Sequence, residues 1–165
     1  MTDRLKDKVC IITGTGSGMG SAAAKLFARE GAHVIGCDIN VAGAETTLAA
    51  VREAGGRMDS LHPCNVSLRP DVDRLMACAE RIGGGIDVLY NNAAMAYFEW
   101  LPEMSYETWS KTLREELDVV FHTCQAAFPH MLKRGSGSII NTGSVSGRLA
   151  LKVLPGLAHM AAKGA

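Results

Sequence analysis

The chain has 165 residues, 47% hydrophobic and 21% charged, which predicts one folded domain, residues 1–165, with a substantial core. Lysine plus arginine equals aspartate plus glutamate at 17 each, so the charge balance predicts no nucleic-acid or membrane-surface partner. Five cysteines without a CxxC pair and five histidines without ligand spacing predict neither a disulfide framework nor a metal site, and a reducing, cytoplasmic location is the default expectation.

Short apolar runs alternate with helical segments along the chain. The expected strands are 9–13, 32–37, 57–64, 86–90 and 138–142, and the expected helices are 21–30, 42–54, 69–82 and 105–133. This alternation predicts an α/β fold, a Rossmann-like doubly wound parallel sheet in three α/β/α layers. None of the apolar runs reaches the length of a membrane span, and the charged first residues are unlike a signal peptide.

The first strand runs into a glycine-rich turn and then a helix. Gly14, Gly16, Gly18 and Gly20 alternate with small residues. Such a junction directs free backbone N–H groups and the positive end of a helix dipole at one point, and the missing side chains let a ligand approach the backbone. A phosphate group fits there, and no Gly-Lys-Ser/Thr follows that would indicate a P-loop. A flexible turn is the alternative.

The second strand ends in Asp38, close to the separation at which a dinucleotide-binding unit places an acid on the adenosine ribose. A carboxylate there repels a 2′-phosphate and favours NAD over NADP. The alternative is a turn or helix-cap role before Ile39 and Asn40. In a sheet of this kind the ligand lies beyond the carboxyl ends of the strands, which directs attention also to 65–66, 91–94 and 143–147.

Together these segments resemble the short-chain dehydrogenase/reductase family over essentially the whole chain. Residues 13–20 match its TGxxxGxG cofactor turn, Asp38 its NAD-selecting acid and 91–94 its NNAG motif. Residues 141–147, NTGSVSG, look like the strand and turn that carry the family's catalytic serine, which makes Ser144 the candidate.

The resemblance implies an NAD-dependent oxidoreductase that moves a hydride between the nicotinamide and a small-molecule secondary alcohol or ketone. It also implies a homo-oligomer that uses the long helix and the helix beginning near Pro155. The implied cofactor contacts are Gly14, Thr15, Ser17, Gly18, Met19, Gly20, Asp38, Ile39, Asn65, Val66, Asn92, Ala93, Ala94 and Lys163.

The departures from the family concern its active site. The family pairs a tyrosine with a lysine four residues later, and here Lys163 holds the lysine place whereas His159 holds the tyrosine place. Thirteen residues before Pro129, where the family has an asparagine, stands Glu116, and Ala94 replaces a glycine of NNAG. Family members continue with two more strands and a substrate-covering segment, so we expect this chain to be truncated after the fifth strand.

These residues suggest an altered way of handling the proton. Ser144 can hydrogen-bond the substrate oxygen, and Lys163 can bind the nicotinamide ribose. An imidazole titrates near about 6.5 and a phenol near about 10, so a histidine accepts a proton without the field of a lysine, which suits alcohol oxidation. We hypothesise that Glu116, His159 and Lys163 form a coupled proton-handling set which, with Ser144, makes up the catalytic residues.

Each of these residues has a structural alternative. His159 can be a helix residue of a catalytically impaired NAD-binding protein that acts as a sensor or partner subunit, because an imidazole is shorter than a phenol. Ser144 can cap a turn, Lys163 can be a solvated helix lysine, and Glu116, between charged neighbours, can belong to a solvated face. A poorly folding truncated product is the third possibility, because the outer edge of the fifth strand has no predicted partner.

Two apolar groups also leave alternatives open. The aromatic group after the NNAA turn either lines a substrate pocket or packs the loop onto the next helix, and consists of Tyr97, Phe98, Trp100 and Trp109. The group at helical spacing in the long helix is core or subunit interface, and consists of Leu113, Leu117, Val120, Phe121, Cys124 and Phe128.

Overall fold

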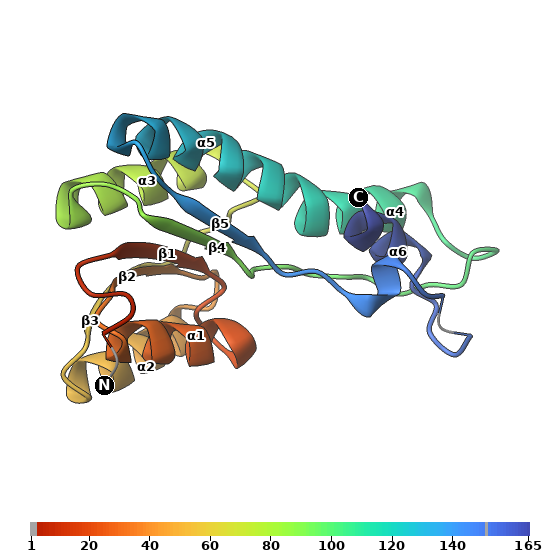
Figure 1. Ribbon diagram of the computed structural model, residues 1–165. Coiled ribbons are helices and arrows are strands. Elements are labelled where there is room, and N and C mark those ends of the chain that lie inside the picture. Colours follow the sequence, from red (N-terminus) through yellow and green to blue (C-terminus); the bar gives the residue numbers. More distant parts are fainter. Residues whose placement is uncertain (1–2, 151) are drawn as a thin grey trace.

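A computed structural model describes residues 3–150 and 152–165 and contains a five-stranded parallel sheet with helices on both faces (Figure 1). The strands are β1 (Val9–Thr13), β2 (His33–Cys37), β3 (Arg57–Leu61), β4 (Val88–Asn91) and β5 (Ser138–Asn141), in the order β3-β2-β1-β4-β5. The order reverses direction at β1, and doubly wound sheets bind ligands beyond the carboxyl ends of the strands at such a point, so we call the region beyond β1 and β4 the crevice. The predicted Rossmann-like doubly wound sheet is confirmed.

The helices divide between the two faces of this sheet. The helical segments are α1 (Gly18–Arg29), α2 (Val41–Glu53), α3 (Arg69–Gly83), α4 (Tyr106–Leu113), a π-turn (Arg114–Asp118), α5 (Val119–Arg134), a 3-10 turn (Val145–Gly147) and α6 (Leu157–Gly164). Helices α1 and α2 cover one face, and α3 and α5 cover the other (Figure 1). Helices α4 and α6 lie beyond the carboxyl ends of the strands (Figure 1).

Two predicted boundaries are wrong by three residues, one predicted helix is interrupted, and the other boundaries differ by two residues or fewer. The strand expected at 57–64 ends at Leu61, because Pro63 follows closely and has no N–H for a ladder bond. Helix α1 begins at Gly18 rather than at residue 21. The helix expected at 105–133 is interrupted by the π-turn Arg114–Asp118, in which the Val119 N–H bonds the Arg114 carbonyl.

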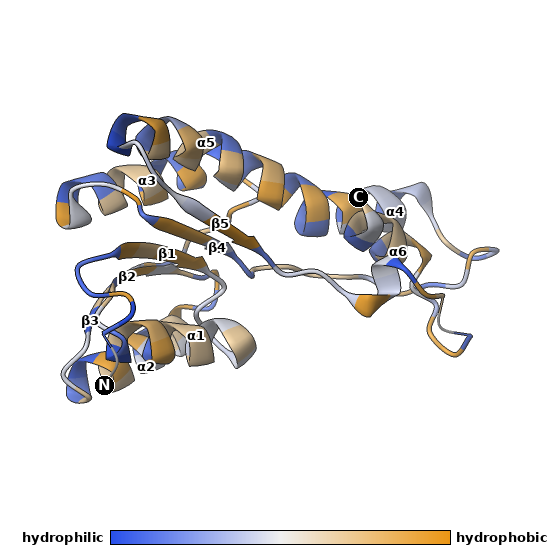
Figure 2. Cartoon of the chain, in the orientation of Figure 1, coloured by the Kyte–Doolittle hydropathy of each residue, from blue (hydrophilic) through white to orange (hydrophobic). Residues whose placement is uncertain are grey.

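The core lies in two layers, one on each face of the sheet. On the α3/α5 side Ile11 and Leu89 are fully buried, and on the α1/α2 side Ile12 and Val34 are. Successive residues of a strand point to opposite faces, so a strand covered by helices on both sides must be apolar throughout. Figure 2 shows this as continuous apolar colour along β1.

Asp87, one residue before β4, fastens the end of the sheet that is remote from the crevice. Its carboxylate is 5% exposed and accepts hydrogen bonds from the Val9 N–H at 2.8 Å and from Arg134 Nε at 2.8 Å, with Lys8 Nζ at 3.4 Å. One buried carboxylate therefore joins β1, β4 and the end of α5.

The outer surface of α5 and the edge strand β5 are apolar and exposed. Phe121, Phe128 and Leu132 are each more than half exposed, so the two phenylalanines are not part of the core. Ile139 and Ile140 of β5 are partly exposed as well. Within residues 3–150 and 152–165, no helix combines the length and the hydropathy that crossing a membrane requires.

Candidate active site

The glycine turn between β1 and α1 adopts conformations that require its glycines. Gly14 and Gly18 have φ values of +76° and +52°, in the left-handed region where a side chain is strained. A Cβ atom at Gly20 would overlap the carbonyl group of Gly14. Ser17 precedes α1 in an extended conformation, and its side chain makes no cap hydrogen bond, which leaves the first N–H groups of α1 directed at the crevice.

Asp38 lies against this turn at the end of β2. One of its carboxylate oxygens accepts a hydrogen bond from the Gly16 N–H at 2.7 Å, and the other accepts one from the Asn40 N–H at 2.7 Å. The second bond is the turn role that the sequence left open, and the first orients the carboxylate toward the glycine turn. Ile39 is 60% exposed beside it, and Thr15 is fully buried with its hydroxyl directed at the Cys37 carbonyl.

The segment after β3 contributes Asn65 and Val66 to the same edge of the sheet. The Asn65 N–H donates to Asp71 at 2.7 Å, and its side-chain oxygen accepts from the Ser67 N–H and hydroxyl, so the turn is held internally. Val66 is buried in the core under α3. Asn65 is exposed, which leaves its amide group accessible to a ligand.

The residues after β4 are tied to the glycine turn. Asn92 and Ala93 donate their N–H groups to the Thr13 hydroxyl, both at 3.0 Å, and the Asn92 amide donates to the carbonyls of Thr13 and Gly14. Asn92 therefore supports the turn through its side chain, whereas Ala94 is exposed toward the crevice side of the strand end. These bonds fix the ends of β1 and β4 relative to one another.

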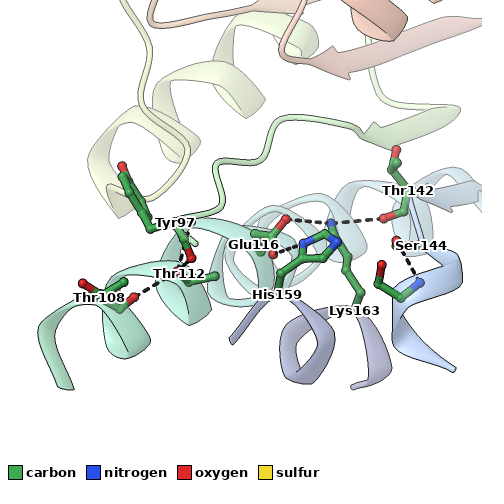
Figure 3. A network of polar contacts seen from close by, with 9 residues as sticks. Tyr97, Thr108, Thr112, Glu116, Thr142, Ser144, His159 and Lys163 are labelled. Carbon is green, nitrogen blue, oxygen red and sulfur yellow. Dashed lines mark hydrogen bonds and ion pairs between the residues drawn. The ribbon is translucent and has the colours of Figure 1, made fainter. Parts of the chain in front are cut away.

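Glu116, His159 and Lys163 form a buried polar cluster. His159 Nδ1 lies 2.7 Å from one oxygen of Glu116, and Lys163 Nζ lies 3.7 Å from the other. Lys163 also donates a hydrogen bond to the Thr142 carbonyl at 3.3 Å. Figure 3 shows the three side chains turned toward one another between the π-turn and α6.

Local structure explains how this cluster forms. His159 and Lys163 are four residues apart on α6, so both project from one face of that helix. Glu116 lies in the π-turn, where the widened backbone turns it toward α6 rather than toward solvent. Glu116 is 5% exposed, and the side chain of Lys163 is 10% exposed, so the solvated-face interpretations of both residues are wrong.

Ser144 lies in the turn after β5, next to the cluster in Figure 3. Its hydroxyl oxygen accepts a hydrogen bond from the Ser146 N–H at 3.1 Å, which is the turn-capping role. The same turn packs closely on α6, because a Cβ atom at Gly147 would overlap the Lys163 carbonyl. A hydroxyl that accepts one bond still has its own proton to donate to a ligand oxygen.

The members of the aromatic group after β4 have different surroundings. Tyr97 packs onto the following helical segment: its hydroxyl donates to Glu115 at 2.9 Å, and its N–H donates to the Thr112 hydroxyl at 3.3 Å. Phe98 instead lies against His159, with ring centroids 5.9 Å apart, and Trp100 is more than half exposed. Packing therefore accounts for Tyr97 but not for the whole group.

Sequence reasoning missed two features of the site. One is the contact between Phe98 and His159, which joins residues far apart in the chain and leaves no local pattern. The other is a buried network in which the Thr123 hydroxyl donates to the Asn91 side chain at 2.7 Å and Asn91 donates to Asn141 at 2.9 Å. A threonine at core spacing in the long helix was the available signal for the second feature.

The residues present fit a nicotinamide dinucleotide. The turn is packed against its own backbone at Gly20 and is open at Gly18, where a Cβ atom would meet nothing within 4 Å. The first turn of α1 offers N–H groups, and Asp38 offers a carboxylate that is already oriented. Lys163 offers an ammonium group at the other end of the crevice. Fold and site together define a dinucleotide-binding α/β protein.

Comparison with known proteins agrees with this class. The profile described as short chain dehydrogenase matches residues 8–165. The 3-oxoacyl-[acyl-carrier-protein] reductase of Thermotoga maritima is 39% identical over 146 residues, which cover 87% of this chain and 58% of that protein. A crystal structure of a putative short-chain dehydrogenase/reductase from Burkholderia xenovorans superposes with a TM-score of 0.92 at 34% identity, covering 98% of this chain and 65% of that chain.

A second solved structure, 7α-hydroxysteroid dehydrogenase complexed with NADH and 7-oxo glycochenodeoxycholic acid, has a TM-score of 0.92 at 26% identity, and the match covers 99% of this chain and 62% of that one. The chain thus belongs to the short-chain dehydrogenase/reductase family, a family of oxidoreductases that use nicotinamide cofactors. It spans between 58% and 65% of the length of these three relatives.

Proposed function

We propose that this chain is an NAD-dependent oxidoreductase acting on a small-molecule secondary alcohol or ketone, and that residues 1–165 form one NAD-binding domain. The observation that carries the proposal is the position of Asp38, whose carboxylate bonds the glycine turn at the end of β2. A carboxylate at this point accepts hydrogen bonds from ribose hydroxyls and repels a 2′-phosphate. The expected cofactor is therefore NAD rather than NADP, in a cytoplasmic setting.

The other cofactor contacts follow from the same edge of the sheet. The turn residues Ser17, Gly18 and Met19 are exposed at the start of α1, where N–H groups would meet the pyrophosphate. Asn65 and its neighbour Val66 would border the adenine. The remaining proposed contacts are Ala93 and Ala94 after β4 and Lys163 at the nicotinamide ribose.

Bound NAD would supply the hydride acceptor, and the protein must handle the proton. With Nδ1 of His159 held by Glu116, Nε2 is the nitrogen that would take the proton of a substrate hydroxyl. The Glu116 carboxylate stabilises the imidazolium that this transfer creates, and Ser144 would donate a hydrogen bond to the substrate oxygen. This assigns catalytic roles to Ser144 and His159, a positioning role to Glu116 and a cofactor role to Lys163.

A second candidate function is a cofactor-binding protein that has lost turnover and acts as a sensor or partner subunit. The observation that favours it is that His159 already has partners within the protein, Glu116 at Nδ1 and the ring of Phe98. An imidazole is also shorter than the phenol that the family uses at this place. Turnover of an alcohol panel with NAD separates the two candidates.

We also propose a homo-oligomer. The exposed apolar stripe of α5, formed by Phe121, Phe128 and Leu132, is a surface of the kind that pairs with a second copy. Sedimentation of the wild type and of Phe128→Glu measures this directly. A wild type that sediments as a monomer at every concentration contradicts it.

The cofactor experiment compares NADH and NADPH binding by calorimetry in the wild type and in Asp38→Ser. The wild type is expected to prefer NADH by about tenfold or more, because a like-charge contact in a partly buried site costs on the order of 1.4 kcal/mol or more. Asp38→Ser is expected to narrow that preference. A folded sample that binds neither dinucleotide overturns the proposed function.

The turnover experiment measures NADH formation from secondary alcohols with the wild type, His159→Ala and His159→Tyr. Loss of about 10²-fold or more in His159→Ala is expected of a general base. Activity that survives His159→Ala at every pH contradicts the base assignment. The second candidate function is supported if the wild type binds NADH without turning over any alcohol and the His159→Tyr variant does turn alcohols over.

A further inference from the structure

The loop after β4 lies beside the segment that leads into α6. Glu99 and Gly156 form a parallel β-bridge, which places the two segments next to one another. A Cβ atom at Gly156 would lie 3.5 Å from the ring of Phe98 and 3.6 Å from the side chain of Leu154. Phe98 is therefore held by backbone pairing at the beginning of the helix that carries His159.

Phe98 and Glu116 bound the imidazole of His159 in different ways. Glu116 binds Nδ1 at 2.7 Å, and the Phe98 ring contacts the imidazole at a centroid separation of 5.9 Å with 57° between the planes. The His159 side chain is 15% exposed, whereas Phe98 is 46% exposed. The Phe98 ring thus contacts the imidazole while nearly half of the residue remains exposed.

We propose that Phe98 is a specificity-determining residue of this site and that the substrate class is secondary alcohols or ketones with a ring next to the oxygen-bearing carbon. This rests on the proposed function. When a substrate oxygen meets His159 Nε2, its carbon skeleton rests against the exposed part of the Phe98 ring. Aromatic surfaces favour flat or cyclic apolar groups at ring separations of about 4.5–7 Å, and a short alkyl group covers little of such a ring.

Neighbouring side chains support an apolar wall. Met95 is half exposed, and its N–H donates to the Glu115 carbonyl at 3.3 Å, next to the residue that holds His159. Val145 directly follows Ser144 and is 64% exposed. The segments after β4 and β5, which carry Phe98 and Ser144, therefore each expose a further apolar side chain.

A purely packing role for Phe98 predicts a different result from a specificity role. Loss of packing on His159 would slow every alcohol by the same factor. Loss of a substrate wall changes the ratio between substrates with and without a ring. The ratio of kcat/KM values is therefore the quantity to measure.

The first experiment measures kcat/KM for 1-phenylethanol and for 2-propanol with NAD, in the wild type, Phe98→Ala, Phe98→Tyr and Ile82→Ala. Ile82 is the control because it is an apolar residue of similar exposure, 40% against 46% for Phe98, and lies in the last turn of α3, outside the proposed site and the proposed subunit interface. The ratio is expected to fall about tenfold in Phe98→Ala and to persist in Phe98→Tyr. A ratio unchanged in Phe98→Ala, or lowered equally in Ile82→Ala, overturns the proposal.

A second experiment needs no turnover. Acetophenone is titrated into the NAD-bound protein with labelled histidine rings, and the His159 imidazole resonances are followed by NMR. The wild type and Ile82→Ala are expected to show a saturable shift that Phe98→Ala loses, whereas an equal shift in Phe98→Ala contradicts the role of Phe98. A shift that depends on Phe98 in a protein without turnover supports the wall and overturns only the proposed function.

Discussion

Replacing Glu116 by glutamine is expected to slow turnover while the fold and cofactor affinity persist. The change keeps the shape of the side chain and removes its negative charge, 2.7 Å from His159 Nδ1 in a place that is 5% exposed. A hydrogen bond to an ionised acceptor is about twice as strong as a bond to a neutral one, so the protonated imidazole loses on the order of 1–2 kcal/mol of stabilisation. Because each loss of about 1.4 kcal/mol of transition-state stabilisation slows a reaction tenfold, kcat is expected to fall about 5–30-fold.

The assay follows NADH formation from a secondary alcohol across a range of pH, and NADH binding is measured in parallel. NADH formation by Glu116→Gln is expected to be slower than that of the wild type while NADH affinity persists, because the imidazolium that forms during turnover loses its charged hydrogen-bond partner. Glu115→Gln is the matched control, since Glu115 lies in the same π-turn but binds Tyr97. A Glu116→Gln profile identical to the wild type, or an equal loss in Glu115→Gln, refutes the reasoning.

Three further predictions concern stability, reactivity and binding. Asp87→Ala is expected to lower the free energy of unfolding in urea by about 2–4 kcal/mol, because it leaves buried donors without an acceptor. The control is Asp73→Ala, which removes an exposed ion pair and should lower the free energy of unfolding by less than about 1 kcal/mol. Equal effects of the two substitutions contradict the prediction. Burial raises the pKa of the Cys10 thiol to about 12, and the adjacent Cys64 thiol together with burial raises the pKa of Cys37 well above its usual range. Both thiols should therefore resist a thiol-specific disulfide reagent in mildly alkaline buffer until the protein unfolds. Rapid labelling of either cysteine in the folded protein, detected by peptide mapping, contradicts this. Gly20→Ala is expected to abolish NADH binding in calorimetry, because its Cβ would overlap the backbone of the glycine turn, and retained affinity contradicts this.

The fold was predictable because its signals are local. A strand buried on both faces must be apolar at every position, and the glycines that end helices carry positive φ values, as at Gly84 and Gly135. The glycine turn and Asp38 were also recognisable, because a phosphate cradle and a ribose acid require those residue types at that separation. The class of sheet was predictable but its strand order was not, because strand order depends on pairings between segments that lie far apart in the chain.

The environment of the candidate proton-handling residues was less accessible to sequence reasoning. Glu116 stands among charged neighbours, and a helix of about 3.6 residues per turn gives no reason to bury it. The π-turn adds a residue to that turn, as the bond from the Val119 N–H to the Arg114 carbonyl shows, and so changes which residues face α6. The contact between Phe98 and His159 depends on the bridge from Glu99, which no periodicity reports.

The Glu116 carboxylate interacts with two nitrogen atoms of α6, the imidazole Nδ1 of His159 at 2.7 Å and the ammonium Nζ of Lys163 at 3.7 Å. If a ribose hydroxyl of a bound dinucleotide attracted the Lys163 ammonium group away from Glu116, the Glu116 carboxylate would interact with the imidazole of His159 alone. Cofactor binding at Lys163 and the hydrogen bond between Glu116 and His159 are then coupled, and coupling between two such events is reciprocal. A substitution that weakened the bond to His159 would change dinucleotide affinity by the same factor by which the dinucleotide changes the strength of that bond.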